Sequence, residues 1–200
     1  MTIAVLDYGM GNLRSVERAL GHVGGDAEIT GDAAAVAAAE ALVIPGVGHF
    51  GACMRGLRSS GLDRAIVAFA GTGRPVFGVC LGMQVLFDAS DEDPAPGLGL
   101  LGGRVRSLPA NVRVPHMGWN TVEWVRHPYV AGIADGEWFC FVHSYAADVS
   151  PATIGTTTYG RTFSAAVAAG NVFATQFHPE KSGDAGLQIY ENFVKAVTAA

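Results

Sequence analysis

Short apolar runs alternate with longer amphipathic segments over about the first ninety residues. The runs TIAVL (2–6), ALVIP (41–45) and RPVFGV (74–79) lack polar alternation, which is typical of strands buried on both faces of a parallel sheet. The segments between and after them have helical periodicity. We predict helices at 12–23, 50–58, 62–69 and 81–90. This alternation indicates an α/β fold with a mostly parallel central sheet flanked by helices.

The pattern changes in the middle of the chain, where short strand-like runs are separated by Gly, Pro and Asp. These runs are 97–109, 111–115, 119–125, 137–145, 153–160 and 162–177. They predict an antiparallel extension of the sheet, followed by a closing helix at 184–197. We find no repeat or linker, and 88–97 is interpreted as a surface loop, so we expect residues 1–200 to form a single domain.

Composition and charge narrow the class of protein. Half of the residues are hydrophobic and the formal net charge is −5, with 13 basic residues that are scattered along the chain. Such a chain does not attract nucleic acid or anionic lipid. The first apolar run ends at Asp7, and no stretch approaches the roughly 20 apolar residues of a membrane span. We therefore expect a cytoplasmic protein with no nucleic acid or membrane partner.

The sequence offers no signal for a metal or a cofactor. The three cysteines are widely spaced without a CxxC pair, and the six histidines include no i, i+4 pair and no HExxH. The segment GMGNLR imitates a dinucleotide-binding fingerprint, but Arg14 occupies the place of its third glycine. We expect reduced thiols, no metal and no nucleotide cofactor.

The segment RPVFGVCLGMQ is the strongest chemical signal. A strand runs into Gly78 and Cys80, and a helix begins at once beside Gly82. A turn this sharp strains its central residue and needs small neighbours, as in the elbow that presents a nucleophilic serine. The helix N-terminus favours the thiolate form of the cysteine. Cys80 is thus the candidate nucleophile, whereas Cys53 and Cys140 are expected to be packed residues.

A catalytic thiol requires a base, and the base requires an orienting group. His178 and Glu180 lie two residues apart at the end of an apolar run, so both side chains can share one face. Two other histidines, His116 and His143, compete for the role of base, but neither is followed by a carboxylate. We therefore predict His178 as the base and Glu180 as its orienting group.

The turn IPGVGHFG follows a buried strand directly. Its glycines let backbone approach a ligand closely, so the N–H groups of Val47 and Gly48, with that of Leu81, are candidates for an oxyanion hole. Taken alone, the same turn is better interpreted as an ordinary loop.

The order of these motifs resembles that of class I glutamine amidotransferases. Further segments extend the resemblance to the glutaminase subunits of imidazole glycerol phosphate synthase, and they span nearly the whole chain. These segments are DYGMGNLRSV, PGVGHFGACM, GVCLGMQ, PHMGWN, FVHSY and FHPEKSGDAGLQIYENF. The resemblance implies a flavodoxin-like class I amidotransferase fold.

The resemblance also implies an activity and a partner. Cys80 would attack the carboxamide of L-glutamine, and His178 would protonate the departing ammonia before water hydrolyses the thioester. Ammonia would pass to a (β/α)₈-barrel cyclase subunit in a heterodimer. There it would react with phosphoribulosyl-formimino-AICAR-phosphate, giving imidazole glycerol phosphate and AICAR for histidine biosynthesis.

The same resemblance assigns further residues. Gln84, Ser144 and Tyr145 would bind glutamine, the last two through their backbone. Four residues would lie toward the cyclase: Asn12, Met117, Trp119 and Lys181. Plainer interpretations remain open, because Gln84 fits a helix face, Lys181 a solvated charge, and Met117 and Trp119 a core. Ser144 stands where a threonine is often found, and it keeps the hydroxyl group.

The resemblance implies that the free subunit is nearly inactive until the cyclase binds its ligand. Glycines on both sides of Val47 make a flip of the Val47–Gly48 peptide cheap, so this peptide is our candidate for the switch. Alternatives are an ammonia-donating subunit for anthranilate, aminodeoxychorismate, GMP or pyridoxal phosphate synthesis, a cysteine peptidase or chaperone of related fold, and a silent binding module.

Overall fold

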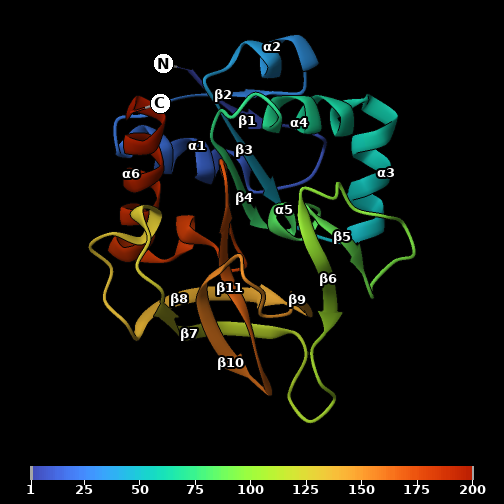
Figure 1. Cartoon of the computed structure of the whole chain (residues 1–200), viewed down its shortest axis with the longest axis vertical. Helices are drawn as coiled ribbons and strands as arrows, with labels where there is room; N and C mark the ends of the chain where they lie inside the picture. The colour runs from blue at the N-terminus through green and yellow to red at the C-terminus, as the bar shows by residue number, and fades with distance from the viewer. Residues whose placement is uncertain (1, 200) are drawn as a thin grey trace.

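The computed structural model describes residues 2–199 and is built on a nine-stranded mixed sheet (Figure 1). Its parallel half consists of β2 (Asp26–Thr30), β1 (Thr2–Leu6), β3 (Ala41–Gly46), β4 (Val76–Cys80) and β12 (Val172–Thr175), in that order. Its antiparallel half continues with β11 (Arg161–Ala169), β10 (Thr153–Tyr159), β7 (His116–Trp124) and β8 (Glu137–His143). The predicted α/β fold with an antiparallel extension is confirmed.

A smaller sheet and the helices complete the chain. The smaller sheet contains β5 (Phe87–Ser90), β6 (Leu101–Ser107) and β9 (Tyr145–Ala147). The helices are α1 (Leu13–His22), α2 (Ala33–Ala38), α3 (Phe50–Ser60), α4 (Leu62–Ala70), α5 (Leu81–Gln84) and α6 (Gly183–Ala199), with 3₁₀ turns η1 (Pro128–Val130) and η2 (Pro179–Lys181). No helix among residues 2–199 is long and apolar enough to cross a membrane.

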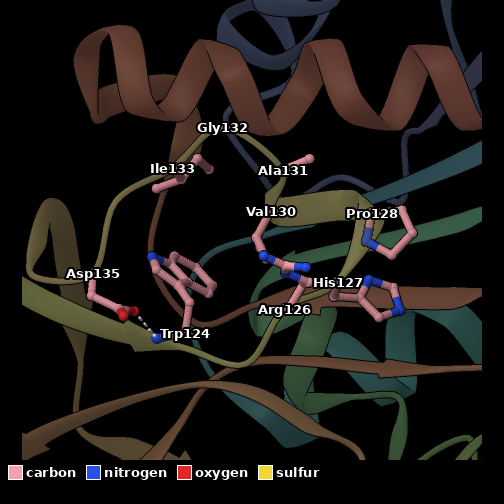
Figure 2. A pocket seen from close by; sticks show the side chains of 9 residues that line it. All are labelled: Trp124, Arg126, His127, Pro128, Val130, Ala131, Gly132, Ile133 and Asp135. Atoms are coloured by element: carbon pink, nitrogen blue, oxygen red, sulfur yellow. Dashed lines mark hydrogen bonds between the residues drawn. The ribbon is translucent and has the colours of Figure 1, made fainter.

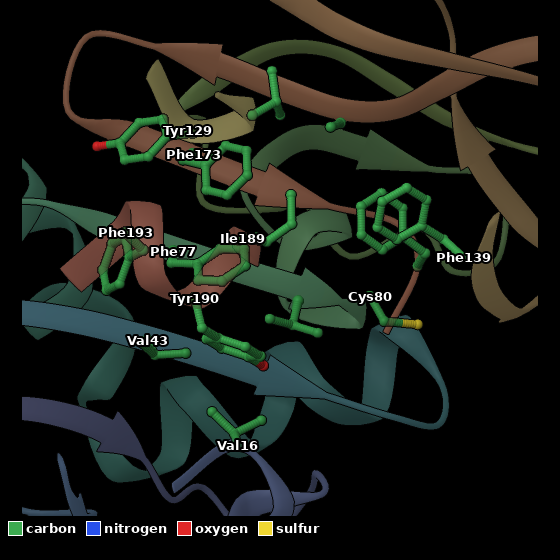
Figure 3. Packing of buried hydrophobic residues seen from close by; sticks show 14 of the residues in the cluster. Val16, Val43, Phe77, Cys80, Tyr129, Phe139, Phe173, Ile189, Tyr190 and Phe193 are labelled. Atoms are coloured by element: carbon green, nitrogen blue, oxygen red, sulfur yellow. The ribbon is translucent and has the colours of Figure 1, made fainter. Parts of the chain in front are cut away.

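Side chains of the parallel strands alternate between two buried clusters, one on each face of the sheet. On β3, Val43 joins the cluster formed with α1 and α6, whereas Leu42 and Ile44 join the cluster formed with α3 and α4. Figure 3 shows the first cluster, in which Cys80 lies with its sulfur directed away from Phe77 and Tyr190. Burial on both faces explains why β3 has no polar side chain.

The helix predicted for 81–90 is wrong beyond its first turn, because α5 ends at Gln84 and 87–90 form β5. The backbone N–H of Leu98 donates to the Val85 carbonyl (2.8 Å), and Leu100 and Leu101 donate to the Leu86 carbonyl (2.9 Å each). These bonds from a distant segment replace the i to i+4 bonds that would have continued the helix.

The strand predicted for 111–115 is also wrong, because this exposed segment pairs with no strand among the described residues. It forms turns, and a Tyr159 hydroxyl bond to the Arg113 carbonyl (2.8 Å) holds it to β10. Conversely, β2 and α2 were not predicted. The strand β2 lies at the edge of the sheet with partly exposed residues, so it lacks the apolar run that identified its neighbours.

Two glycines allow the chain to turn from β4 into α5. A Cβ atom at Gly82 would lie 1.8 Å from the carbonyl oxygen of Ile44 on β3, and one at Gly78 would lie 2.8 Å from the carbonyl oxygen of Gly82. Backbone thus packs directly on backbone at the carboxyl end of the sheet. This contact sets the position of Cys80 relative to β3.

We expect Gly82→Ala to destabilise the protein by roughly 1–3 kcal/mol or more, because the added methyl group overlaps the β3 backbone. Gly21→Ala is the matched control, since it places the same methyl group in open space on α1 and is expected to stabilise the helix by about 0.5–1 kcal/mol. Urea unfolding measures both changes. Equal stabilities of the two variants would contradict this account of the turn.

Candidate active site

Cys80 lies at the carboxyl end of β4, near the middle of the large sheet. Its φ of 55° and ψ of −108° make it the one non-glycine residue with positive φ among residues 2–199. Positive φ is strained for a side chain and is found where surrounding structure enforces it. The residue is 5% exposed and belongs to the lining of a cavity.

His178 and Glu180 form a buried pair, with His178 Nδ1 2.8 Å from Glu180 Oε1. The strand β12 ends at Thr175, so their contact comes from the η2 turn that begins at Pro179. The backbone N–H of His178 donates to the Cys140 carbonyl (2.9 Å), and the Ser182 hydroxyl donates to the His178 carbonyl (2.7 Å). The turn is therefore fastened to β8.

The electrostatic setting of His178 favours its charged form. Burial lowers the pKa of the imidazole, but hydrogen bonds with Cys80 and Glu180, together with their charges, outweigh burial and raise the pKa to about 10. Since Nδ1 faces Glu180, Nε2 is the nitrogen available to Cys80. A protonated imidazole beside a cysteine is the arrangement that supports a thiolate.

His116 and His143 face each other on β7 and β8, and His116 Nδ1 lies 3.0 Å from His143 Nε2. His143 Nδ1 donates to the Tyr145 carbonyl (2.9 Å), so in the neutral ring His143 Nε2 accepts from His116. Burial lowers the pKa of His116 to about 4 and that of His143 to about 3. Both rings are uncharged at neutral pH, and neither has a carboxylate partner among residues 2–199.

A cavity of about 280 Å³ opens beside Cys80. It brings together the residues predicted for the oxyanion hole, those predicted to bind glutamine, and Lys181. Its lining consists of Val47, Gly48, Cys80, Leu81, Gln84, Glu92, Pro115, Val142, His143, Ser144, Tyr145, His178 and Lys181. Glu180 lies behind His178, whereas Asn12, Met117 and Trp119 lie outside the lining.

Gln84 is a buried member of this lining and not a free helix-face residue. Its amide nitrogen donates to the Tyr145 carbonyl (2.9 Å) and to Gln176 Oε1 (3.0 Å). Because both hydrogens of that nitrogen are in use, the Gln84 amide oxygen is the group left for a ligand. The Tyr145 carbonyl accepts from both Gln84 and His143 and has no further capacity.

The turn after β3 lies against the loop after β1. Gly48 has φ of 102°, and a Cβ atom there would lie 2.7 Å from Met10 Cε. The Tyr8 hydroxyl donates to the Pro45 carbonyl (2.6 Å), which fixes the start of the turn. Neither Val47 nor Gly48 donates a backbone hydrogen bond to any residue in the described range 2–199. Their N–H groups are available to a ligand.

Met117 and Trp119 are 69% and 54% exposed on β7, so their interpretation as core residues is wrong. Trp138, 53% exposed on β8, was not singled out from the sequence and lines the same surface hollow as Trp119. We call Met117, Trp119 and Trp138 the apolar strip. Cys53 is fully buried, as predicted, and Cys140 is partly buried.

Sequence reasoning missed two residues near Cys80. Glu92 lines the cavity, and its carboxylate accepts from the backbone N–H of Phe50 (2.7 Å) at the start of α3. Gln176 is fully buried, and its amide nitrogen lies 3.7 Å from the Cys80 sulfur. The bond that holds Glu92 at the cavity joins it to Phe50, which is 42 residues away in the chain. No local sequence pattern reveals such a contact. Gln176 lies two residues before His178, and this proximity was the available signal.

A larger hollow of about 680 Å³ lies elsewhere, beside η1 (Figure 2). It is lined by Trp124, Arg126, His127, Pro128, Val130, Ala131, Gly132, Ile133 and Asp135, and it contains no cysteine. No cluster of metal-ligating side chains occurs within the part of the chain that the structure describes. The smaller cavity at Cys80 is therefore the candidate active site.

Comparisons with known proteins agree on the kind of protein this site belongs to. The family model for glutamine amidotransferase class-I matches residues 4–197. Proteins named imidazole glycerol phosphate synthase subunit HisH are 49% identical over 199 residues in Symbiobacterium thermophilum and 46% identical over 199 residues in Methanothermobacter thermautotrophicus. These alignments cover 98% of this chain in both cases, and 94% and 100% of the relatives.

Solved structures show the same fold. A structure described as a glutamine amidotransferase superposes with a TM-score of 0.77 at 22% identity, covering 98% of both chains. A putative GMP synthase protein from Thermoplasma acidophilum gives a TM-score of 0.75 at 16% identity, covering 100% of this chain and 94% of that one. At these identities the likeness concerns the fold alone.

The raised pKa of His178 predicts a pH-dependent stability. Because the folded pKa of about 10 exceeds the ordinary 6.5, this stabilisation is complete below pH 6.5 and is lost as the pH rises toward 10. Glu180→Gln should therefore lower the free energy of unfolding more at pH 6 than at pH 10.5. The difference between the losses at the two pH values should be roughly 1–3 kcal/mol. Glu28→Gln, on an exposed position of β2, is the control. A pH-independent effect of Glu180→Gln in urea unfolding would refute the pairing.

Proposed function

The chain belongs to the class-I glutamine amidotransferase family, among the HisH subunits of imidazole glycerol phosphate synthase, and we propose that Cys80, His178 and Glu180 form its catalytic triad. It is a cysteine-dependent glutaminase of histidine biosynthesis. The observation that supports the triad best is the buried His178–Glu180 pair in contact with the strained Cys80 at a cavity.

The reaction begins from the ion pair in which His178 Nε2 already holds the proton of Cys80. The sulfur then attacks the carboxamide carbon of glutamine, and the resulting oxyanion accepts hydrogen bonds from the N–H groups of Val47, Gly48 and Leu81. Collapse of this intermediate breaks the C–N bond, and His178 protonates the leaving nitrogen, which departs as ammonia. Water hydrolyses the glutamyl thioester and releases glutamate.

Each triad member has a distinct task. Because the pKa of His178 is raised to about 10, the imidazole retains its proton at neutral pH until the leaving nitrogen takes it. Glu180 holds Nδ1 and therefore keeps Nε2 directed at the sulfur. The Gln84 amide oxygen, with Ser144 and the backbone of Tyr145, holds glutamine at the sulfur.

The relatives are subunits of a synthase, so a partner subunit belongs to the function. We propose a (β/α)₈-barrel cyclase as that partner, in a one-to-one heterodimer, to which ammonia passes without release. The apolar strip on β7 and β8 supports this, since exposed tryptophans are typical of interface centres. We propose that Asn12 and Lys181 also face the cyclase, and that the chain is a single domain that acts in the cytoplasm.

Glutamate release from glutamine tests the whole proposal. The purified chain should show low activity alone and strong stimulation by the cyclase subunit with its nucleotide ligand, and Cys80→Ala should abolish both. Cys53→Ala, which removes a buried thiol from α3, should keep the activity. Stimulation by a different synthase, with none by the cyclase, would leave the triad standing and overturn the proposed partner. Activity surviving in Cys80→Ala would overturn the triad.

Gly48→Ala tests the Val47–Gly48 peptide as the switch. A side chain at φ of 102° is strained, so the substitution disfavours the present orientation of the peptide and restricts its exchange between two orientations. We expect at least about a tenfold loss of ligand-stimulated glutaminase activity, because the variant loses the contribution of an oxyanion-hole donor. Gly73→Ala changes another glycine of positive φ, with open space around it, and should retain stimulation. Intact activation in Gly48→Ala would remove this peptide from the mechanism.

A further inference from the structure

A continuous chain of buried amides ends at the nucleophile. The Tyr145 carbonyl accepts from Gln84 Nε2 (2.9 Å), Gln84 Nε2 also donates to Gln176 Oε1 (3.0 Å), and Gln176 Nε2 lies 3.7 Å from Cys80 Sγ. Gln176 has no exposed surface and Gln84 is 5% exposed. Buried amides tied together in this way have one arrangement of donors and acceptors, which the network itself determines.

The polarity of the chain is set at its far end. A carbonyl can only accept, so the Gln84 atom facing Tyr145 must be the amide nitrogen. The second hydrogen of that nitrogen then requires an acceptor, which is Gln176 Oε1. The remaining end of the Gln176 side chain is therefore an N–H donor, and it faces the sulfur. A second donor, His143 Nδ1, also binds the Tyr145 carbonyl (2.9 Å) and holds it in place.

We propose that Gln176 is a further catalytic residue, which donates a hydrogen bond from its side-chain amide to the Cys80 thiolate. The inference rests on the proposed function, because it concerns the sulfur of that triad. No covalent bond to Gln176 forms or breaks. The thiol proton moves to His178 Nε2, and the amide N–H of Gln176 stabilises the negative charge left on sulfur.

The charge on the sulfur decides how much the amide contributes. Toward a neutral thiol, an N–H at 3.7 Å is a weak donor, whereas toward a thiolate the bond is charge-assisted and roughly twice as strong. The other groups around the sulfur are the imidazole of His178, the carbonyl of Val142 at 3.8 Å, and, acting at longer range, the phenol of Tyr8. The carbonyl repels a thiolate, so His178 and Gln176 are the two side chains among residues 2–199 that favour it.

The test is the pH dependence of Cys80 alkylation by iodoacetamide, followed by mass spectrometry of the peptide containing Cys80. Gln176→Met keeps the length of the side chain and removes the donor. We expect its alkylation midpoint to rise by about one pH unit, the change that loss of one hydrogen bond to a charged group produces. The kcat of cyclase-stimulated glutaminase activity should fall about tenfold, with a smaller change in KM.

Gln176→Glu is the second variant, which keeps the acceptor for Gln84 and replaces the donor with a carboxyl group. Its alkylation midpoint should also rise. Thermal unfolding shows whether each variant is folded, so Gln176→Glu still tests the proposal if Gln176→Met does not fold. Gln188→Met on α6 is the matched control for alkylation of the free chain, since the Gln188 side chain donates only to Glu191 and Asn192 among residues 2–199 and its loss should leave the alkylation curve unchanged.

An alkylation curve that coincides with wild type in the folded Gln176 variants would overturn the proposal, even if glutamine hydrolysis were slower. In that case Gln176 would act through substrate placement. Failure of the proposed function has a different signature, because the wild-type chain itself would then release no glutamate with Cys80 intact.

Discussion

The direct packing of the β4–α5 turn on the end of β3 is the constraint on which the rest of the site depends. Glycine at 82 lets the α5 backbone contact the Ile44 carbonyl of β3, and glycine at 78 makes room for the Gly82 carbonyl. Cys80, between these two glycines, has a positive φ. From that position the sulfur meets β8 through the Val142 carbonyl and the His178 imidazole beside it. A strained residue persists only where its surroundings hold it, and here two buried clusters hold the strands on either side.

Three buried histidines lie within this small region and differ in charge because their neighbours differ. His178 has Glu180 and Cys80 as partners, and its pKa is raised; His116 and His143 contact each other and neutral groups, and burial lowers the pKa of both. The same side chain therefore supplies a cation at the sulfur and an uncharged hydrogen-bonding link at the Tyr145 carbonyl. The Cys80 sulfur and the Glu180 carboxylate beside His178 make the difference.

The sequence allowed prediction of those parts that local pattern determines. The apolar runs at 2–6, 41–45 and 74–79 predicted β1, β3 and β4 of the parallel half, and the spacing around Cys80 and His178 named residues that the fold brings together. Contacts between distant segments escaped prediction. The segment 81–90 looked helical until backbone bonds from 98–101 were known, and Gln176 meets Cys80 across 96 residues. Such pairings depend on the register of the whole sheet, which no short window contains.

The attachment of the η2 turn to β8 has a second consequence, because it affects the tendency of the chain to aggregate. The strand β8 is the last of the large sheet, and an open edge beside exposed tryptophans invites strand-to-strand aggregation. The backbone N–H and carbonyl of Cys140 are instead occupied by the Ser182 hydroxyl (3.0 Å) and the His178 backbone N–H (2.9 Å). The segment that positions an imidazole thus also closes part of a sheet edge, so selection for solubility and selection for catalysis act on the same few residues.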